Sequence, residues 1–202
     1  MMKTRLRCFN RVIFLAIVAT AAAGCGGDDS APGDGGSGGS GGSGGDGGGE
    51  TKIGTSKGDW EVYTNPFGDG GASPIPSTIK GSVDAFSPGS SKMRVKLTVS
   101  GLPASRPFGS HLHKLACADN KAGAHYQNNA APDGGASDPM YANNKNEVWL
   151  DFVTDAMGAG SAEANVDWTP RAGEAKSVVI HDLMTKNDGT AGAKLACISM
   201  EF

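Results

Sequence analysis

The sequence predicts an all-β domain, a Greek-key sandwich or barrel, that follows an export signal and a flexible linker. Three observations lead to this prediction. Short segments alternate apolar and polar residues with a period of two, which is typical of half-buried strands. Glycine and proline separate these segments, and no segment sustains a long helical period. Several short strands at such spacing indicate two packed sheets or one closed sheet.

The clearest strand covers residues 93–99, where Met, Val, Leu and Val share one face and Arg, Lys and Thr the other. Residues 147–153 and 161–168 flank a short glycine-containing connector, and we expect them to pair as a hairpin. Residues 60–63 are expected to add an edge strand. The remaining predicted strands are 79–86, 175–181 and 193–200.

The N-terminus is typical of an export signal. Within residues 1–24, four basic residues precede an apolar stretch, residues 12–23, that is too short to anchor the chain across a bilayer. The signal ends in Ala-Ala-Gly before Cys25, which resembles a bacterial lipobox and predicts lipidation of this cysteine. The alternative is an ordinary cleavage site followed by a chance cysteine. Residues 25–50 are dominated by Gly, Ser and Asp, a composition that predicts a flexible linker.

The domain itself is expected to span residues 51–202. Removing the signal takes four of the eighteen basic residues and none of the twenty-one acidic ones, which leaves a net charge of −7. An acidic chain is poorly suited to bind nucleic acid or anionic lipid through its overall charge. We therefore expect no nucleic-acid partner, and contact with a membrane only through the N-terminal lipid.

Two cysteines, Cys117 and Cys197, remain in the domain. In an oxidising compartment such a pair is expected to form a disulfide. The alternative is that both thiolates bind a metal, although Cys117 has no second cysteine near it in the sequence.

The chain has only four histidines, and all of them are candidate ligands of one metal ion. His111 and His113 are two residues apart on a predicted strand, so their side chains share a face with Cα atoms about 6.6 Å apart. His125 opens a long segment without strand pattern, residues 126–145, and His181 ends a β-branched run. Imidazole is the commonest metal ligand among side chains. Singly, each histidine also fits a surface position or a hydrogen-bonded core position.

Several motifs together resemble the copper–zinc superoxide dismutase family. Gly-Ser-His111-Leu-His113 is similar to the family's Gly-x-His-x-His strand, and Gly-Ala-His125 to the motif that opens its zinc loop. The strand ending in His181 resembles the one that carries the fourth copper ligand. Residues 189–197 match the C-terminal signature except at Lys194.

The resemblance implies a sandwich of the superoxide dismutase type over residues 79–200. It further implies copper bound by His111, His113, His125 and His181. The ligand chemistry agrees, because an imidazole site suits copper or zinc, and Cu(II) binds most tightly among the divalent first-row metals. The resemblance also implies a disulfide between Cys117 and Cys197.

The zinc site of the family is not matched. Residues 126–145 contain no histidine, and Asp133 and Asp138 alone would make a poor zinc site. We therefore expect zinc to be absent, as in a copper-only branch of the family, with His125 as a terminal copper ligand.

Three further departures lie near the C-terminus. Lys194 follows His181 by only thirteen positions, so the loop between them is shorter than in the family and predicts a more open site. Thr185 stands where the family has an aspartate that orients a ligand. Lys194 replaces an arginine and keeps its charge but not its planar fork, so it is expected to attract superoxide without orienting it.

The resulting hypothesis is a copper-dependent superoxide dismutase, exported and lipid-anchored to a bacterial membrane, facing the periplasm or the cell surface. Superoxide would be converted to dioxygen and hydrogen peroxide. The alternative is a copper-sequestering lipoprotein on the same fold without dismutase activity. A scaffold or adhesion domain with relic histidines is a third interpretation, which four matching ligands disfavour.

Overall fold

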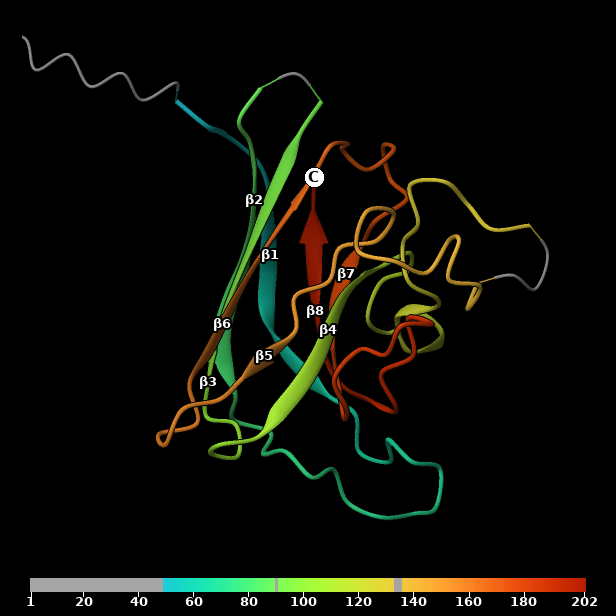
Figure 1. Cartoon of the computed structure of the whole chain (residues 1–202). Coiled ribbons are helices and arrows are strands. Elements are labelled where there is room, and N and C mark those ends of the chain that lie inside the picture. The colour runs from blue at the N-terminus through green and yellow to red at the C-terminus, as the bar shows by residue number, and fades with distance from the viewer. Residues whose placement is uncertain (1–48, 90, 133–135) are drawn as a thin grey trace, which may run out of the picture. The chain divides into compact units, whose positions relative to one another are not determined.

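The computed structural model describes residues 49–89, 91–132 and 136–202, which form an all-β domain (Figure 1). The predicted signal, Cys25 and most of the predicted linker lie outside the described residues. No helix among the described residues is both long enough and apolar enough to cross a membrane. The strands are β1 (Thr51–Val62), β2 (Lys80–Ser87), β3 (Met93–Ser100), β4 (Pro107–His113), β5 (Phe152–Val153), β6 (Gly160–Val166), β7 (Ser177–His181) and β8 (Lys194–Glu201).

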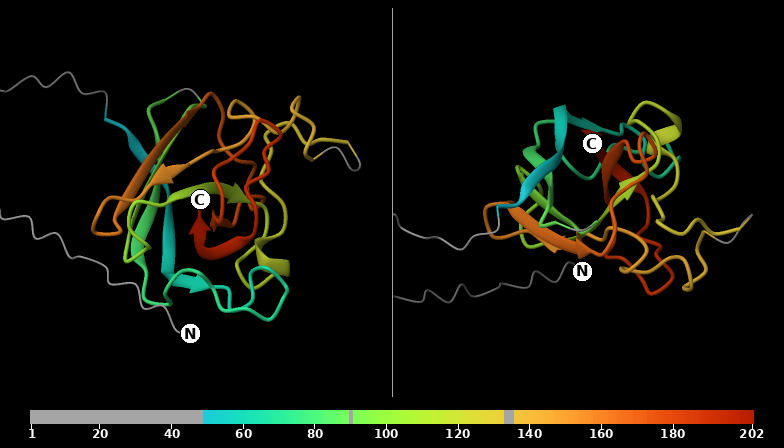
Figure 2. Two further views of the ribbon diagram at one scale, coloured as in Figure 1. Left: turned by 60° about the horizontal axis from the view of Figure 1, so that its bottom comes forward. Right: turned by 90° about the horizontal axis from the view of Figure 1, so that it is seen from above.

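All eight strands belong to one antiparallel sheet in the order β5-β4-β7-β8-β1-β2-β3-β6. The two ends of this order, β5 and β6, follow each other in the chain and contact each other. The sheet therefore curls round and closes nearly into a barrel (Figure 2). The expected all-β class is confirmed at this level.

The apolar core lies inside this curved sheet. β3 shows how the sequence builds it, because its burial alternates residue by residue and Met93, Val95, Leu97 and Val99 are the buried positions. Successive side chains of a strand point to opposite faces, so every second side chain of β3 lies on the inner face of the sheet. Trp60 and Trp168 are also part of the core.

The predicted hairpin of residues 147–153 and 161–168 is wrong. β5 is only two residues long and pairs with β4, whereas β6 pairs with β3 at the other end of the sheet order. The chain before β5 runs beside β4, where Leu150 N–H donates to the carbonyl of Ser110 at 2.7 Å. Residues 154–159 then cross between the two ends of the sheet.

The strand predicted at residues 60–63 is confirmed over residues 60–62, but the predicted place at an edge of the sheet is wrong. Trp60 belongs to β1, which lies inside the sheet between β8 and β2. The folded part begins slightly before it, because the guanidinium of Arg94 on β3 donates to the carboxylate of Glu50. Glu50, placed in the linker by its composition, is thus attached to the sheet.

The pairing of β4 with β7 positions the histidines. His181 lies opposite Gly109, and His113 opposite Ser177. On β4, Phe108 and Leu112 point into the core, so the alternating residues His111 and His113 point to the outer face. The loops that follow β4, precede β5 and join β7 to β8 lie on this side of the two strands (Figure 1). They bury residues that an open sheet would expose to water.

Candidate metal centre

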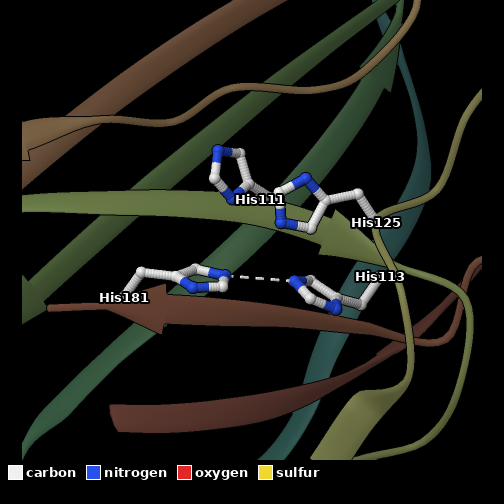
Figure 3. Close-up of side chains that lie close together, drawn as sticks. All are labelled: His111, His113, His125 and His181. Atoms are coloured by element: carbon white, nitrogen blue, oxygen red, sulfur yellow. Dashed lines mark hydrogen bonds between the residues drawn. The ribbon is translucent and has the colours of Figure 1, made fainter. Parts of the chain in front are cut away.

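The four histidines of the sequence come together at one place (Figure 3). One ring nitrogen from each lies within 4.8 Å of the corresponding nitrogens of the others. Two nitrogens bound to one ion at about 2.0 Å are at most about 4 Å apart, so small movements bring all four to bonding distance. The predicted set of His111, His113, His125 and His181 is confirmed as a cluster that can hold a metal ion.

β4 and β7 supply three of the four ligands, and His125 arrives from the following loop. The N–H of Lys114 donates to the carbonyl of Ala124 at 3.0 Å, and the N–H of Tyr126 donates to the carbonyl of Leu112 at 2.8 Å. These two bonds lay the segment around His125 against the end of β4. His125 thereby lies opposite His113, with ring centroids 4.8 Å apart.

Close packing of this outer face requires a glycine at position 109. A Cβ atom there would lie 2.5 Å from the carbonyl oxygen of Leu183 and 2.8 Å from the Cβ of Ala191. Only glycine allows the β7–β8 loop to approach β4 so closely. The glycine before the His-x-His pair is therefore explained by the loop that covers the site.

Each imidazole keeps one nitrogen for the cluster because the other meets a protein partner. Nδ1 of His113 donates to the carbonyl of Gly123 at 3.1 Å, and Nδ1 of His181 donates to the carbonyl of Gly192 at 3.4 Å. Nδ1 of His125 lies 3.0 Å from the carboxylate of Glu147. In all three rings this leaves Nε2 to face the centre.

His111 is oriented the other way. Its Nε2 lies 2.7 Å from the hydroxyl of Thr185, and its Nδ1 is buried without a hydrogen-bond partner. A buried polar atom without a partner costs about 1–3 kcal/mol, so its presence needs an explanation. A metal ion bound by all four histidines supplies that explanation, since Nδ1 of His111 would then be its ligand atom.

Burial keeps these rings neutral. His111 and His113 are fully buried, and the loss of hydration together with the neighbouring imidazoles lowers the pKa of both well below the usual value. Burial, followed by the charge of His125, lowers the pKa of His181 to about 3. A neutral imidazole has a free lone pair, which is the form that binds a metal.

Glu147 is a site residue that the sequence did not reveal. Its carboxylate is 1% exposed and accepts three hydrogen bonds: from Nδ1 of His125 at 3.0 Å, from the indole of Trp149 at 2.8 Å and from the amide of Gln127 at 2.8 Å. A buried carboxylate is tolerated only with such partners. Its signal in the sequence is a single acidic residue beside an apolar run, which predicts only the start of a strand.

Lys194 stands at the start of β8 beside the cluster, as the sequence suggested. Its ammonium donates to the carbonyl of Lys121 at 2.8 Å and to that of Gly123. Burial, and then the charge of Lys121, lowers the pKa of Lys194. Lys194 therefore contacts the same carbonyl that orients His113.

The cluster opens onto a cavity of about 430 Å³. Three of the histidines, His113, His125 and His181, line it together with Lys194. His111 is not among the lining residues and lies behind them. Most of the remaining wall consists of small residues from the loops before β5 and between β7 and β8, so a small solute can reach the ligand nitrogens.

The predicted disulfide is present. Cys117 and Cys197 are bonded, with Cα atoms 5.6 Å apart. The bond ties the loop after β4 to β8, and the phenol of Tyr63 donates to the carbonyl of Cys117 at 3.1 Å. The alternative of two metal-bound thiolates is thereby wrong.

Of the two aspartates considered for zinc, Asp133 lies outside the described residues. Asp138 accepts a hydrogen bond from the backbone N–H of Met140 at 2.9 Å and is part of a turn. No protein-family model matches the chain, and no curated protein sequence matches it either.

Proposed function

We propose that the protein is a copper-dependent superoxide dismutase with a Greek-key fold of that type and a site that works without zinc. The observation that carries the proposal is the convergence of four imidazoles, each with one nitrogen held by the protein and one facing the cluster. Such a donor set suits copper, which binds imidazole more tightly than the other divalent first-row metals. Copper would supply the redox chemistry, because it cycles between two oxidation states and can accept and return one electron.

The protein residues would perform the remaining tasks. His113, His125 and His181 present Nε2 atoms to a cavity that a diatomic anion enters easily. Lys194 adds a positive charge to the wall of the same cavity, which favours the approach of an anion. Because burial keeps His113 and His181 neutral at physiological pH, their Nε2 atoms need not lose a proton before they bind a metal.

Glu147 supports the zinc-free form of the proposal. In the resembled family the counterpart of His125 bridges copper and zinc. Here the nitrogen of His125 that points away from the cluster meets the carboxylate of Glu147 at 3.0 Å. The carboxylate can hold the proton on Nδ1 and balance positive charge on the ring, so a proton taken up at Nε2 during turnover would be stabilised.

Copper sequestration is the second candidate, and the contacts of Lys194 favour it. The ammonium is held by two backbone carbonyls, so it serves the loop structure whether or not an anion ever arrives. Tight copper binding requires the four histidines and their partners but no catalytic cation. On this reading the protein would hold copper at the membrane, anchored through Cys25.

Metal loading followed by a dismutase assay tests both candidates. The purified protein is offered copper, zinc and an equal mixture, and its metal content is measured by mass spectrometry. We expect one copper per chain, little zinc, and superoxide removal by the copper form in pulse radiolysis. Copper without turnover would favour sequestration, whereas stoichiometric zinc without copper would contradict both candidates.

A further inference from the structure

We propose that Thr185 and Asp151 form a relay that determines which nitrogen of His111 faces the metal. The inference rests on the proposed function for the identity of the metal, and it assigns two positioning residues to the same centre. His111 comes from β4, Asp151 immediately precedes β5, and Thr185 lies in the loop after β7. Three segments distant in the sequence thus meet at one ring.

The contacts are short and sequential. Nε2 of His111 lies 2.7 Å from Oγ1 of Thr185, and the same Oγ1 lies 2.6 Å from Oδ1 of Asp151. The second oxygen of Asp151 accepts the backbone N–H of Thr185 at 2.8 Å. Thr185 is therefore bound to the carboxylate through both its backbone and its side chain.

The direction of the hydrogen bonds follows from the chemistry of the groups. A hydroxyl has one hydrogen to donate, and a carboxylate oxygen can only accept. The hydroxyl of Thr185 accordingly donates to Asp151 and accepts from His111. The acceptor role requires the hydrogen of neutral His111 to be on Nε2, which leaves the lone pair on Nδ1.

The relay explains why His111 differs from the other three rings. His113 and His181 donate from Nδ1 to backbone carbonyls, and His125 donates from Nδ1 to Glu147. Of the four rings only His111 is held at Nε2, and its Nδ1 is buried without a partner in the described part of the protein. Because the relay puts the hydrogen on Nε2, the lone pair of His111 is on Nδ1, and Nδ1 can bind the metal.

Asp151 also connects the ring to the position of the covering loop. Its Oδ1 accepts the backbone N–H of Ser110 on β4 at 3.2 Å, while both its oxygens hold Thr185. Displacement of the β7–β8 loop would therefore break the contact that sets the hydrogen of His111. Loop position and ligand tautomer depend on a single carboxylate.

The test measures the tautomer directly, by long-range ¹H–¹⁵N correlation of the histidine rings in the metal-free protein. We expect His111 to carry its hydrogen on Nε2 in the parent protein and to lose this preference in Thr185→Val. Thr185→Ser keeps the hydroxyl and should retain the parent spectrum. Copper affinity should fall about 10- to 100-fold in Thr185→Val and return in Thr185→Ser.

Thr98→Val is the matched control, because Thr98 is an exposed threonine on β3, a strand that pairs with neither β4 nor β7, and its hydroxyl lies 3.4 Å from that of Ser82. It should change neither the ring spectrum nor the affinity. A hydrogen on Nδ1 of His111 in the parent protein would overturn the proposal, even if Thr185→Val does not fold. So would a Thr185→Val protein with unchanged tautomer and affinity. Both readings are independent of whether the copper form removes superoxide.

Discussion

Nε2 of His113 lies 3.2 Å from Nε2 of His181, although 68 residues separate them in the chain (Figure 3). Both rings donate from Nδ1 to backbone carbonyls, of Gly123 and Gly192, so both Nε2 atoms carry lone pairs. The two nitrogens lie within hydrogen-bonding distance, but with both hydrogens on Nδ1 neither Nε2 can donate, and a cation that accepts both lone pairs satisfies both atoms. The pair is thus arranged for a shared metal ion.

The first prediction concerns the ligands. His113→Ala or His181→Ala should abolish both stoichiometric copper binding and dismutation, because each removes one of four donors to the same ion. Copper should also raise the unfolding free energy of the parent protein, by about 4 kcal/mol at a free concentration 1,000 times its Kd. Copper content, pulse radiolysis and denaturant titration measure these effects. Asn165→Ala, on the exposed face of β6, should behave as the parent, and full copper occupancy in either histidine variant would contradict the prediction.

Glu147→Gln should weaken the site and the fold together. Three N–H groups point at the carboxylate, and a carboxamide would direct its own N–H₂ at one or more of them. We expect a loss of about 1–3 kcal/mol in unfolding free energy and a lower copper affinity. The comparison is Glu163→Gln, an exposed carboxylate on β6, which should change stability little. Equal stability of the two variants would argue against the role given to Glu147.

Lys194 is predicted to act on both rate and structure. If it attracts superoxide, kcat/KM of the copper form should fall as ionic strength rises, and Lys194→Met should lower the rate and flatten this dependence. Lys194→Arg, which keeps the charge, should preserve the slope. A parent rate that does not respond to salt would remove the guiding role.

Lys194 also stabilises the loop whose backbone carbonyls it binds, so its substitution should affect the fold. Asn120, Lys121 and Ala122 have φ values of 46°, 48° and 68°, a run of left-handed residues without glycine. Such conformations cost about 1–3 kcal/mol each and persist only when the surroundings hold them. Lys194→Met should therefore also lower the unfolding free energy, measured in urea, whereas the salt dependence reports the charge alone.

Reduction of the Cys117–Cys197 disulfide should destabilise the domain. The bond closes a loop with a sequence separation of 80, for which the chain-entropy model gives about 4 kcal/mol. The same loop carries the carbonyl of Gly123 that orients His113, so copper affinity should fall as well. Urea unfolding with and without reductant measures the first effect. Reductant should have no further effect on Cys197→Ser, and an unchanged midpoint in the parent would contradict the prediction.

The metal-free protein should lose stability as the pH falls below about 6.5. The pKa of His181 is lowered to about 3 in the folded state, mainly by burial, against an ordinary value of 6.5. Between these values the unfolded chain binds the extra proton, so protonation favours unfolding, by up to about 1.4 kcal/mol per pH unit for one such ring. His111 and His113 act in the same direction. Urea midpoints at successive pH values should decline from pH 6.5 downward, and a flat profile from pH 7 to 4 would contradict the assigned burial.

The strands differ in how well the sequence predicts them. The alternation at residues 93–99 predicted β3 almost to the residue, because one face of that strand meets the core and the other meets water. The same reasoning failed to find the partner of residues 147–153: Val148, Leu150 and Phe152 are buried in alternation, but only two residues form a regular ladder, and they pair with β4. Alternation indicates that a segment is extended, but it does not indicate which strand lies beside it.

Residue types and local spacing alone determined the all-β class, the four candidate ligands and the cysteine pair. These depend on side-chain chemistry and on the two-residue period of a strand, both of which are visible in the sequence. Only the tertiary structure decided which group holds each ring: Glu147 is 22 residues from His125, and Thr185 is 74 residues from His111. Hydrogen bonds act over about 3 Å regardless of chain separation, so these partners are selected by the way the sheet closes and the loops fold over β4 and β7.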